Sequence, residues 1–295
     1  YRDGWKEYEW RWAAKSSKLK PRTFAKPRWQ GHESLIDKTI FIYQEQGLGD
    51  TIQFVRYIAL LKQLGARVIF ETPPPLLELF SINRLADQLI PPSSPVPEFD
   101  FHCALMSLPL AFDTEVDRPP SAKPYLKTSE DKLHQWSITL EEKRLPRVGL
   151  VWSGNANHLN DQRRSVALED LFNHLPTGID YVSLQKEVRH TDLSVLEKSG
   201  IRHFGEQLHD FTDTAALCDH MDLIISVDTS VAHLAAALGR PTWILLPFSP
   251  DWRWLMSRSD SIWYETIRLF RQDATKNWAN VLAHLTNEMA RFLDS

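Results

Sequence analysis

The sequence predicts an α/β fold made of two facing Rossmann-like domains. Short apolar, β-branched stretches alternate with amphipathic stretches, and this alternation runs twice, once in each half of the chain. Each run fits a series of βαβ units with right-handed crossovers, which builds an open parallel sheet. A Pro-rich, charged stretch at about 117–146 separates the two runs. Such domains bind ligands at the carboxyl ends of their strands, so we expect a site in the crevice between them.

The chain opens with an expected short helix that has an aromatic face. Trp5, Tyr8 and Trp12 fall at helical spacing. Such a face needs a neighbour, either the body of the protein or a preceding helix. Because the chain begins at Tyr1 in mid-pattern, without Met or a signal peptide, we expect it to be a fragment of a longer protein.

The first run begins with a buried strand at 39–43 and an amphipathic helix at 51–64 that Gly65 ends. Its other expected elements are strands at 67–71, 88–90 and 99–103 and a helix at 76–82. A further helix at about 131–142 lies in the stretch that connects the two runs.

The second run begins with a strand at 147–152. The strands expected after it are 181–184, 201–204, 223–227, 241–246 and 267–270, with helices at 168–174, 193–198, 214–220 and from Ser230 towards Gly239. A long amphipathic helix at 278–293 closes the chain.

Four segments follow from this pattern. We expect a helix and linker over 1–31, a first domain with the interdomain connection over 32–145, a second domain over 146–274, and a terminal helix over 275–295.

Composition limits the function classes. A net charge of -4 and a pI near 6.3 argue against a dedicated nucleic-acid binder, which would carry a basic face. No run of about 18 apolar residues exists, so the sequence predicts no membrane span. The two cysteines sit inside apolar runs and show no Cys-x-x-Cys spacing, which is typical of a cytoplasmic protein without a thiolate metal site.

The most informative segment runs from Asp222 to Gly239. A buried strand stops on Asp228, Thr229 and Ser230, and a helix of small residues starts at once. Free N–H groups and the positive helix end favour an anion there, while the carboxylate suits sugar hydroxyls. The alternative is that Asp228 or Thr229 only caps the helix.

A second loop of this kind follows the first strand. Gly47 and Gly49 allow a ligand to approach the backbone closely. A dinucleotide fingerprint would need a third glycine where Ile52 stands, so we reject an NAD site. Asp50 is either a helix N-cap or a general base, with His102 or Glu45 as the substitutes for that base.

Three more loops lie at strand ends of the second run. Ser153, Gly154 and Asn155 form a compact loop suited to phosphate, with Arg163 or Arg164 nearby, or else an Asx-rich turn. Gln185 and Lys186 end the next strand, and the ammonium group suits a diphosphate. Trp252 and Trp254 could stack on a sugar or base, or simply pack.

The scattered histidines, among them His102, His158 and His233, form no metal-ligand cluster in the sequence. His233 is expected to pack, within reach of a phosphate. No Gly-x-Ser-x-Gly motif is present, so acyl-transfer chemistry has no nucleophile.

These blocks carry a resemblance. Residues 45–54, 149–155, 182–186, 226–235 and 250–254 resemble the glycosyltransferase domain at the end of bacterial tetratricopeptide-repeat proteins. That domain is similar to the ADP-heptose lipopolysaccharide heptosyltransferases and more distantly to the O-GlcNAc transferases. Residues 5–12 resemble the last helix of the repeat array.

The resemblance implies a GT-B fold, with the acceptor bound by the first domain, the nucleotide-sugar donor by the second, and the terminal helix crossing back to the first. It implies Asp50 as catalytic base and Lys186, Asp228, Thr229, Ser230 and His233 as donor ligands. No metal or other cofactor is expected, because the helix dipole, backbone amides and lysine stabilise the leaving nucleotide. The remaining expected contacts are Ser153, Gly154, Asn155 and Gln185 with the donor, and Gly47, Gly49, His102, Trp252 and Trp254 with substrate.

The predicted function is therefore an inverting, metal-independent transfer of a sugar to a hydroxyl of a protein or glycan. A nucleotide-sugar 2-epimerase shares the fold and stays open as an alternative, as does a degenerate transferase that serves as an interaction module. The donor base is open as well, since the nearest ribose-binding candidate is the weak segment 206–210.

Overall fold

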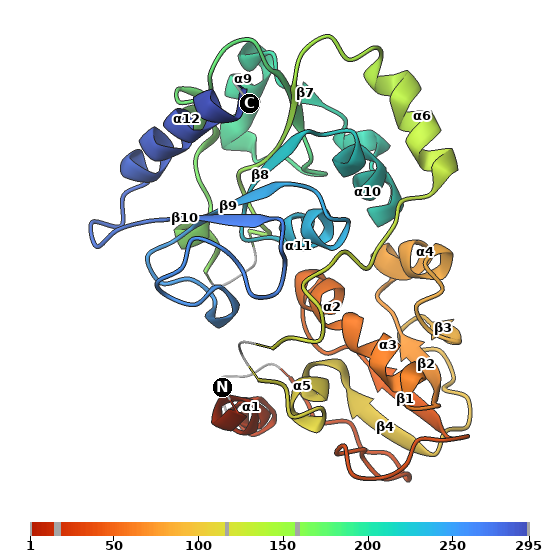
Figure 1. Cartoon of the computed structure of the whole chain (residues 1–295). Helices are drawn as coiled ribbons and strands as arrows, with labels where there is room; N and C mark the ends of the chain where they lie inside the picture. Colours follow the sequence, from red (N-terminus) through yellow and green to blue (C-terminus); the bar gives the residue numbers. More distant parts are fainter. Residues whose placement is uncertain (1, 15–18, 116–117, 157–159, 294–295) are drawn as a thin grey trace. The chain divides into compact units, whose positions relative to one another are not determined.

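The structure is a computed structural model that describes residues 2–14, 19–115, 118–156 and 160–293. His158 falls outside these residues. The chain divides into two compact units, Tyr1–Ala122 and Lys123–Ser295 (Figure 1). Each unit is an α/β body with its own parallel sheet, as the sequence predicts.

The first unit contains a four-stranded sheet of order β3-β2-β1-β4. The strands are β1 (Thr39–Tyr43), β2 (Arg67–Glu71), β3 (Gln88–Ile90) and β4 (Phe101–Ala104), and all pairs are parallel. Tyr43 at the end of β1 is in register with Glu71 on one side and Ala104 on the other. The loops that follow β1, β2 and β4 therefore leave the same edge of the sheet.

The helix expected at 51–64 is two helices. α2 (Leu48–Phe54) and α3 (Arg56–Gln63) are separated at Val55. The Arg56 side chain donates through Nε to the carbonyl of Gln53 at 2.7 Å, an oxygen that a continuous helix would use for the N–H four residues on. The other helical elements after β1 in this unit are α4 (Pro74–Ile82), η2 (Leu105–Ser107) and α5 (Leu108–Ala111).

The N-terminal segment belongs to the first unit. It forms α1 (Arg2–Tyr8) and a 3-10 turn η1 (Glu9–Trp12). Trp5 is buried edge-on against Phe54 and donates its indole N–H to the carbonyl of Thr114 at 2.9 Å. The body of the unit thus covers Trp5, whereas Tyr8 and Trp12 of the same aromatic face are half-buried.

The second unit has a six-stranded parallel sheet of order β10-β9-β8-β5-β6-β7. The strands are β5 (Arg147–Val151), β6 (Asp180–Ser183), β7 (Arg202–His203), β8 (Leu223–Val227), β9 (Thr242–Leu246) and β10 (Ile267–Arg271). The chain winds outward in one direction from β5 and in the other from β8. The boundary between β5 and β8 is therefore the topological switch point, where open α/β sheets bind ligands.

The helical elements of this unit alternate with its strands. They are α6 (Glu130–Leu140), α7 (Asp161–Arg164), α8 (Leu168–Phe172), α9 (His190–Ser199), η3 (Gly205–Gln207), α10 (Phe211–Asp219), α11 (Ser230–Ala237), η4 (Trp252–Trp254) and α12 (Ala279–Leu293).

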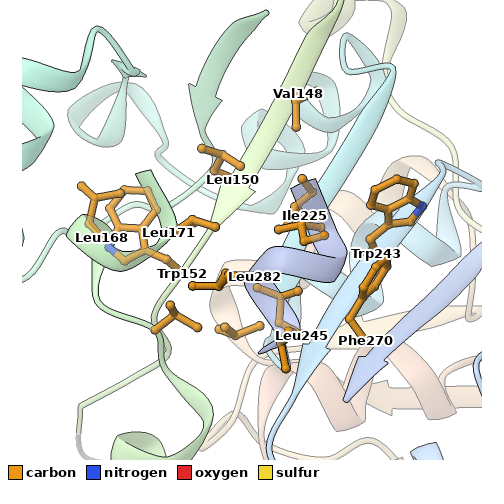
Figure 2. Packing of buried hydrophobic residues seen from close by; sticks show 14 of the residues in the cluster. Val148, Leu150, Trp152, Leu168, Leu171, Ile225, Trp243, Leu245, Phe270 and Leu282 are labelled. Carbon is orange, nitrogen blue, oxygen red and sulfur yellow. The ribbon is translucent and has the colours of Figure 1, made fainter. Parts of the chain in front are cut away.

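The terminal helix α12 packs on the second unit. Leu282 and Leu285 are buried in the cluster that holds Leu150 of β5 and Leu245 of β9. Figure 2 shows Leu282 among the side chains of the sheet. The apolar face of α12 is thus packed on the sheet of the second unit. That this helix also crosses back to the first domain stays a prediction.

The expected domain boundary at residue 145 also differs from the structure. The units meet at Ala122 and Lys123, so α6 belongs to the second. Its Lys132 and Trp136 both donate to Asp213 Oδ1 of α10, at 2.7 and 3.2 Å. These contacts make the expected connection part of the second unit.

Candidate functional site

The loops that follow β5, β6 and β8 carry most of the predicted donor ligands. β8 is buried along its whole length and ends where Asp228 and Thr229 follow. Thr229 is the N-cap of α11, with extended backbone (φ -140°, ψ 170°), but its side chain makes no cap hydrogen bond. Its hydroxyl lies 3.2 Å from Ser226 Oγ instead. The view that Thr229 serves only as a side-chain cap therefore does not hold.

Asp228 sits between two arginines. Its carbonyl accepts from Arg164 Nη1 at 2.8 Å, and its side chain is 18% exposed. Burial raises the pKa of Asp228, while the positive charges of Arg253 and Arg164 oppose the shift. The carboxyl is thus partly buried but still open on one side, a suitable acceptor for a ligand hydroxyl.

His233 is held inside the unit rather than presented to a ligand. It is 2% exposed, and its Nε2 faces Arg253 Nη1 at 3.4 Å. An arginine nitrogen can only donate, so Nε2 accepts and Nδ1 carries the proton, which it donates to the Tyr264 hydroxyl at 3.0 Å. His233 thus packs beside Arg253, and its predicted role as a ligand of the nucleotide-sugar donor stays a prediction.

The loop after β9 packs more than the sequence suggested. Trp254 is 1% exposed and stacks on His233 with ring centroids 5.4 Å apart, so it offers no free face to a sugar. Trp252 is half-buried, edge-on to Trp263. Arg253 lies between them, and no local pattern in the sequence marks it. It is the residue of this loop that contacts His233 and acts electrostatically on Asp228.

Gln185 fixes the loop after β5. Its Oε1 accepts from the N–H groups of Trp152 and Ser153 at 2.8 and 2.9 Å, and its Nε2 donates to Ser153 Oγ at 3.2 Å. These donors are therefore engaged within the protein. Gln185 and Ser153 shape the loop. The sequence predicts a different role for them, in which they bind the nucleotide sugar.

Gly154 is the place where this loop meets the arginines. A Cβ at this position would lie 2.4 Å from Arg164 Nη2, so a side chain would displace the guanidinium. The Gly154 N–H donates to Ser165 Oγ at 3.2 Å. Asn155 follows and is exposed. The sequence singled out Arg164 through the Arg-Arg pair, and the structure brings it to Gly154 and Asp228.

Lys186 remains exposed at the end of β6. Its Nζ donates to the carbonyl of His209 at 3.3 Å, a contact that a phosphate could replace. Lys186, Arg164 and the start of α11 thus follow the adjacent strands β6, β5 and β8 at one edge of the sheet.

In the first unit, Asp50 is not an N-cap. α2 begins earlier, with Gly47 as its N-cap, and Asp50 occupies the third helical position. Asp50 Oδ2 accepts from the Gly47 N–H at 3.1 Å, so the carboxylate closes the turn from inside the helix. Gly49 lies in the first turn of α2, and Asp50 is half-buried.

His102 does not join this loop. It lies in the middle of β4, packed against Phe24 with ring centroids 4.5 Å apart. Burial lowers its pKa, and the positive charges of Arg28 and Arg22 lower it further, which keeps the ring neutral. The structure thus gives His102 a packing position in an aromatic cluster, not a place at a strand end.

Glu45 is the titrating group nearest in the chain to Asp50. Its side chain is 5% exposed, and Oε1 accepts from Arg11 Nη2 at 2.9 Å and from the Met106 N–H at 3.3 Å. Burial raises its pKa to about 7, with a further rise from Asp50 and an opposing effect from Arg11. Its position after β1 was visible in the sequence, but its burial was not.

Among the residues that the structure describes, no three His, Cys, Asp or Glu side chains gather to hold a metal ion. No helix in the described parts of the chain is long and apolar enough to cross a membrane.

Comparisons with known proteins agree with this geometry. Residues 209–246 match the model of glycosyltransferase family 9 (heptosyltransferase), a segment that covers α10, β8, α11 and β9. The chain is 25% identical over 321 aligned residues to Protein FlbA of Caulobacter vibrioides, an alignment that covers 99% of this chain. It covers 53% of FlbA, so the chain spans about half the length of this relative.

Solved structures share the fold. E. coli ADP-heptose lipopolysaccharide heptosyltransferase II superposes with a TM-score of 0.62 at 15% identity, covering 86% of this chain and 98% of that one. A family 9 glycosyltransferase from Veillonella parvula gives 0.59 at 12% identity over 81% and 87% of the two chains. E. coli heptosyltransferase WaaC, solved with ADP-2-deoxy-2-fluoro heptose, gives 0.55 at 12% over 87% and 99%. The α/β fold with parallel sheets is thus that of heptosyltransferases of the GT-B type.

The family segment and the fold together support a glycosyltransferase enzyme. The expected relation to tetratricopeptide-repeat proteins and to O-GlcNAc transferases stays a prediction.

Proposed function

We propose that this chain transfers a sugar from a nucleotide-diphosphate donor to a hydroxyl of a protein or glycan, with inversion and without a metal. The observation that carries the proposal is the family 9 match over residues 209–246, because this segment contains Asp228 and Thr229 at the switch point of the sheet. Two structural relatives are described as heptosyltransferases of E. coli, one of them with an ADP-heptose analogue.

The donor diphosphate would lie across the strand ends of the second unit. Lys186 supplies a mobile positive charge, Arg164 a fixed one, and α11 the N–H groups of its first turn. Asp228 would accept hydroxyl groups of the sugar. These charges stabilise the leaving nucleoside diphosphate, which is the task a metal performs in other transferases.

The acceptor reaction is assigned to the first unit. Asp50 would take the proton of the acceptor hydroxyl, whose oxygen then attacks the anomeric carbon while the bond to the diphosphate breaks. A single displacement of this kind inverts the anomeric configuration. The acceptor would be a protein or glycan. We propose that tetratricopeptide repeats precede this segment in the parent chain and present the acceptor to it.

A product assay tests the function. The protein is incubated with a panel of nucleotide sugars and a bacterial extract as acceptor source, with and without EDTA, and nucleoside diphosphate and sugar conjugates are followed by mass spectrometry. We expect diphosphate release coupled to conjugate formation, unchanged by EDTA. Release of an epimerised free sugar would show that the protein is a nucleotide-sugar 2-epimerase and not a transferase. Activity that is lost in EDTA and restored by Mg²⁺ would refute the metal-free mechanism.

A further inference from the structure

The N-terminal segment reaches into the loop that carries Asp50. Tyr8 of α1 accepts through its hydroxyl from Gln46 Nε2. Arg11 of η1 donates to Glu45. Residues 45 and 46 lie directly before the N-cap Gly47, so two side chains of the segment hold two successive residues of this loop.

Arg11 is held through both of its terminal nitrogens, while its buried Nε has no hydrogen-bond partner among the described residues. Its side chain is 7% exposed, and its guanidinium donates to Glu45 Oε1 at 2.9 Å, Ser107 Oγ at 2.6 Å and Glu9 Oε1 at 2.8 Å. It also lies over the Tyr8 and Trp12 rings, 4.8 and 4.6 Å from their centroids. A planar guanidinium held by this many partners has little freedom to move.

The network joins the ends of two neighbouring strands. Glu45 follows β1 and Ser107 follows β4, so Arg11 bridges the two loops at the carboxyl edge of the sheet. Glu9 extends the network to Arg28, 2.6 Å from its Oε2.

Glu45 links the contacts of Arg11 to the loop that contains Asp50. One carboxylate oxygen is bound by Arg11 and Met106, while Oε2 is buried and has no hydrogen-bond partner among the described residues. An ionised carboxylate in this position depends on Arg11 for compensation. Five residues on, Asp50 binds the Gly47 N–H, so the turn from Glu45 to Asp50 is fixed at both ends.

We propose that the N-terminal helical segment, acting through Arg11 and Glu45, holds the loop that presents Asp50, which makes Arg11 a positioning residue for the transfer reaction. This inference rests on the proposed function. Any movement of a preceding part of the parent chain that shifts η1 would then change the position of the proposed base.

Arg11→Met tests the proposal, because it keeps the apolar stem and removes the guanidinium. Arg22→Met is the matched control: Arg22 also pairs with a glutamate at a strand end of this unit, Glu71 at 2.7 Å, and also lies over the Phe24 ring. We expect Arg11→Met to lower kcat by about 10–100-fold, the scale of a small misplacement of a catalytic group. KM for the nucleotide sugar should stay unchanged, and Arg22→Met should behave as the parent.

A double mutant distinguishes positioning from general damage. If Arg11 acts through Glu45, then Arg11→Met combined with Glu45→Gln loses little more kcat than the worse single variant. Independent, multiplying losses, or equal kcat values for Arg11→Met and Arg22→Met, would overturn the proposal. If Arg11→Met does not fold, Arg11→Gln serves in its place: it keeps a polar side chain but removes the positive charge, so an unchanged kcat in that variant would equally overturn the proposal.

Hydrogen exchange gives a reading that needs no turnover. Amides of 46–54 should exchange faster in Arg11→Met than in Arg22→Met, while the amides of β5 and β8 stay equally protected. Equal exchange at 46–54 would refute the hold on the loop even in a preparation without transferase activity. If 46–54 exchange faster in Arg11→Met but the parent shows no transferase activity, the proposed role of Arg11 in holding the loop would stand and the proposed function would be contradicted.

Discussion

Asp50 combines two possible roles in one side chain at the start of α2. Its Oδ2 closes the turn at Gly47, and the carboxylate lies just past the end of β1, where a base would be needed. The two roles respond differently to substitution. An amide oxygen can accept the Gly47 N–H as a carboxylate does, but an amide cannot take a proton.

We therefore expect Asp50→Asn to fold and to bind donor as the parent does, while kcat falls by about 10²–10⁴, the usual contribution of a positioned base. Asp50→Ala should lose activity as well and lower the free energy of unfolding by about 0.5–1.5 kcal/mol, the net value of one hydrogen bond. Steady-state rates and urea unfolding of both variants measure this. An Asn variant with nearly normal turnover would leave Asp50 with only its structural role.

Glu45 makes the stability of the first unit depend on pH. Its pKa is raised from 4.5 to about 7 in the folded state, so the folded state holds the proton more tightly than the unfolded chain does. The associated stability is present below pH 4.5 and is lost as the pH rises to about 7, by at most about 3 kcal/mol. Arg11, Asp50, Tyr43 and Cys103 are the charged or titratable groups that act with Glu45.

Glu45→Gln should flatten this part of the profile. Urea unfolding of the parent and of the variant between pH 5 and pH 8, with Asp87→Asn as a half-exposed control, gives the comparison. A parent profile that rises through this window, or equal slopes in the parent and Glu45→Gln, would contradict the raised pKa.

At the scale of elements, α12 contributes apolar side chains to the core of the second unit. Leu285 is fully buried in the cluster with Trp152 and Leu245, whereas Asn287 on the same helix is exposed. Leu285→Ala should lower the free energy of unfolding by about 2–5 kcal/mol, and Asn287→Ala should change it little. Hydrogen exchange in Leu285→Ala should rise in β5 and β9. A rise confined to the strands of the first unit would show that the helix braces that unit instead.

Elements with a strong local pattern could be predicted from the sequence. The strands at 39–43 and 223–227 are mostly apolar runs, followed by Gln44 and Glu45 in the first case and by Asp228 and Thr229 in the second. Both the type of element and its polar end were therefore visible. The apolar face of α12 was visible as well. The element that covers this face was not visible. Periodicity shows that one face of a helix is buried, but it does not show which element the face packs against.

The remaining features depend on contacts between distant residues. Arg253 meets His233 and Arg164 meets Asp228 across many residues of chain, and no local spacing marks such pairs. Arg11 and Glu45, separated by 34 residues, are a further case. Gln185 was predicted to bind the nucleotide sugar because it follows a strand, yet its side-chain amide is hydrogen-bonded to the neighbouring loop.

At the scale of the molecule, the two units divide the proposed reaction. The second carries the proposed donor ligands Lys186, Arg164 and Asp228 near its switch point, and the first carries the proposed base Asp50 in α2. Because each unit has its own sheet and core, damage to one proposed site should leave binding at the other intact. Donor binding can therefore be measured without knowing the acceptor.

The binding of nucleoside diphosphates tests the central claim most directly. Calorimetric titration of the full chain with ADP, UDP and GDP should find at least one that binds, and Lys186→Ala should weaken it by about 1.5–3 kcal/mol, the value of a charge-assisted hydrogen bond. Lys198→Ala, an exposed lysine of the same unit, is the control and should bind as the parent does. If none of the nucleotides binds, or if Lys186→Ala binds as tightly as the parent, the second unit is not the donor site described above.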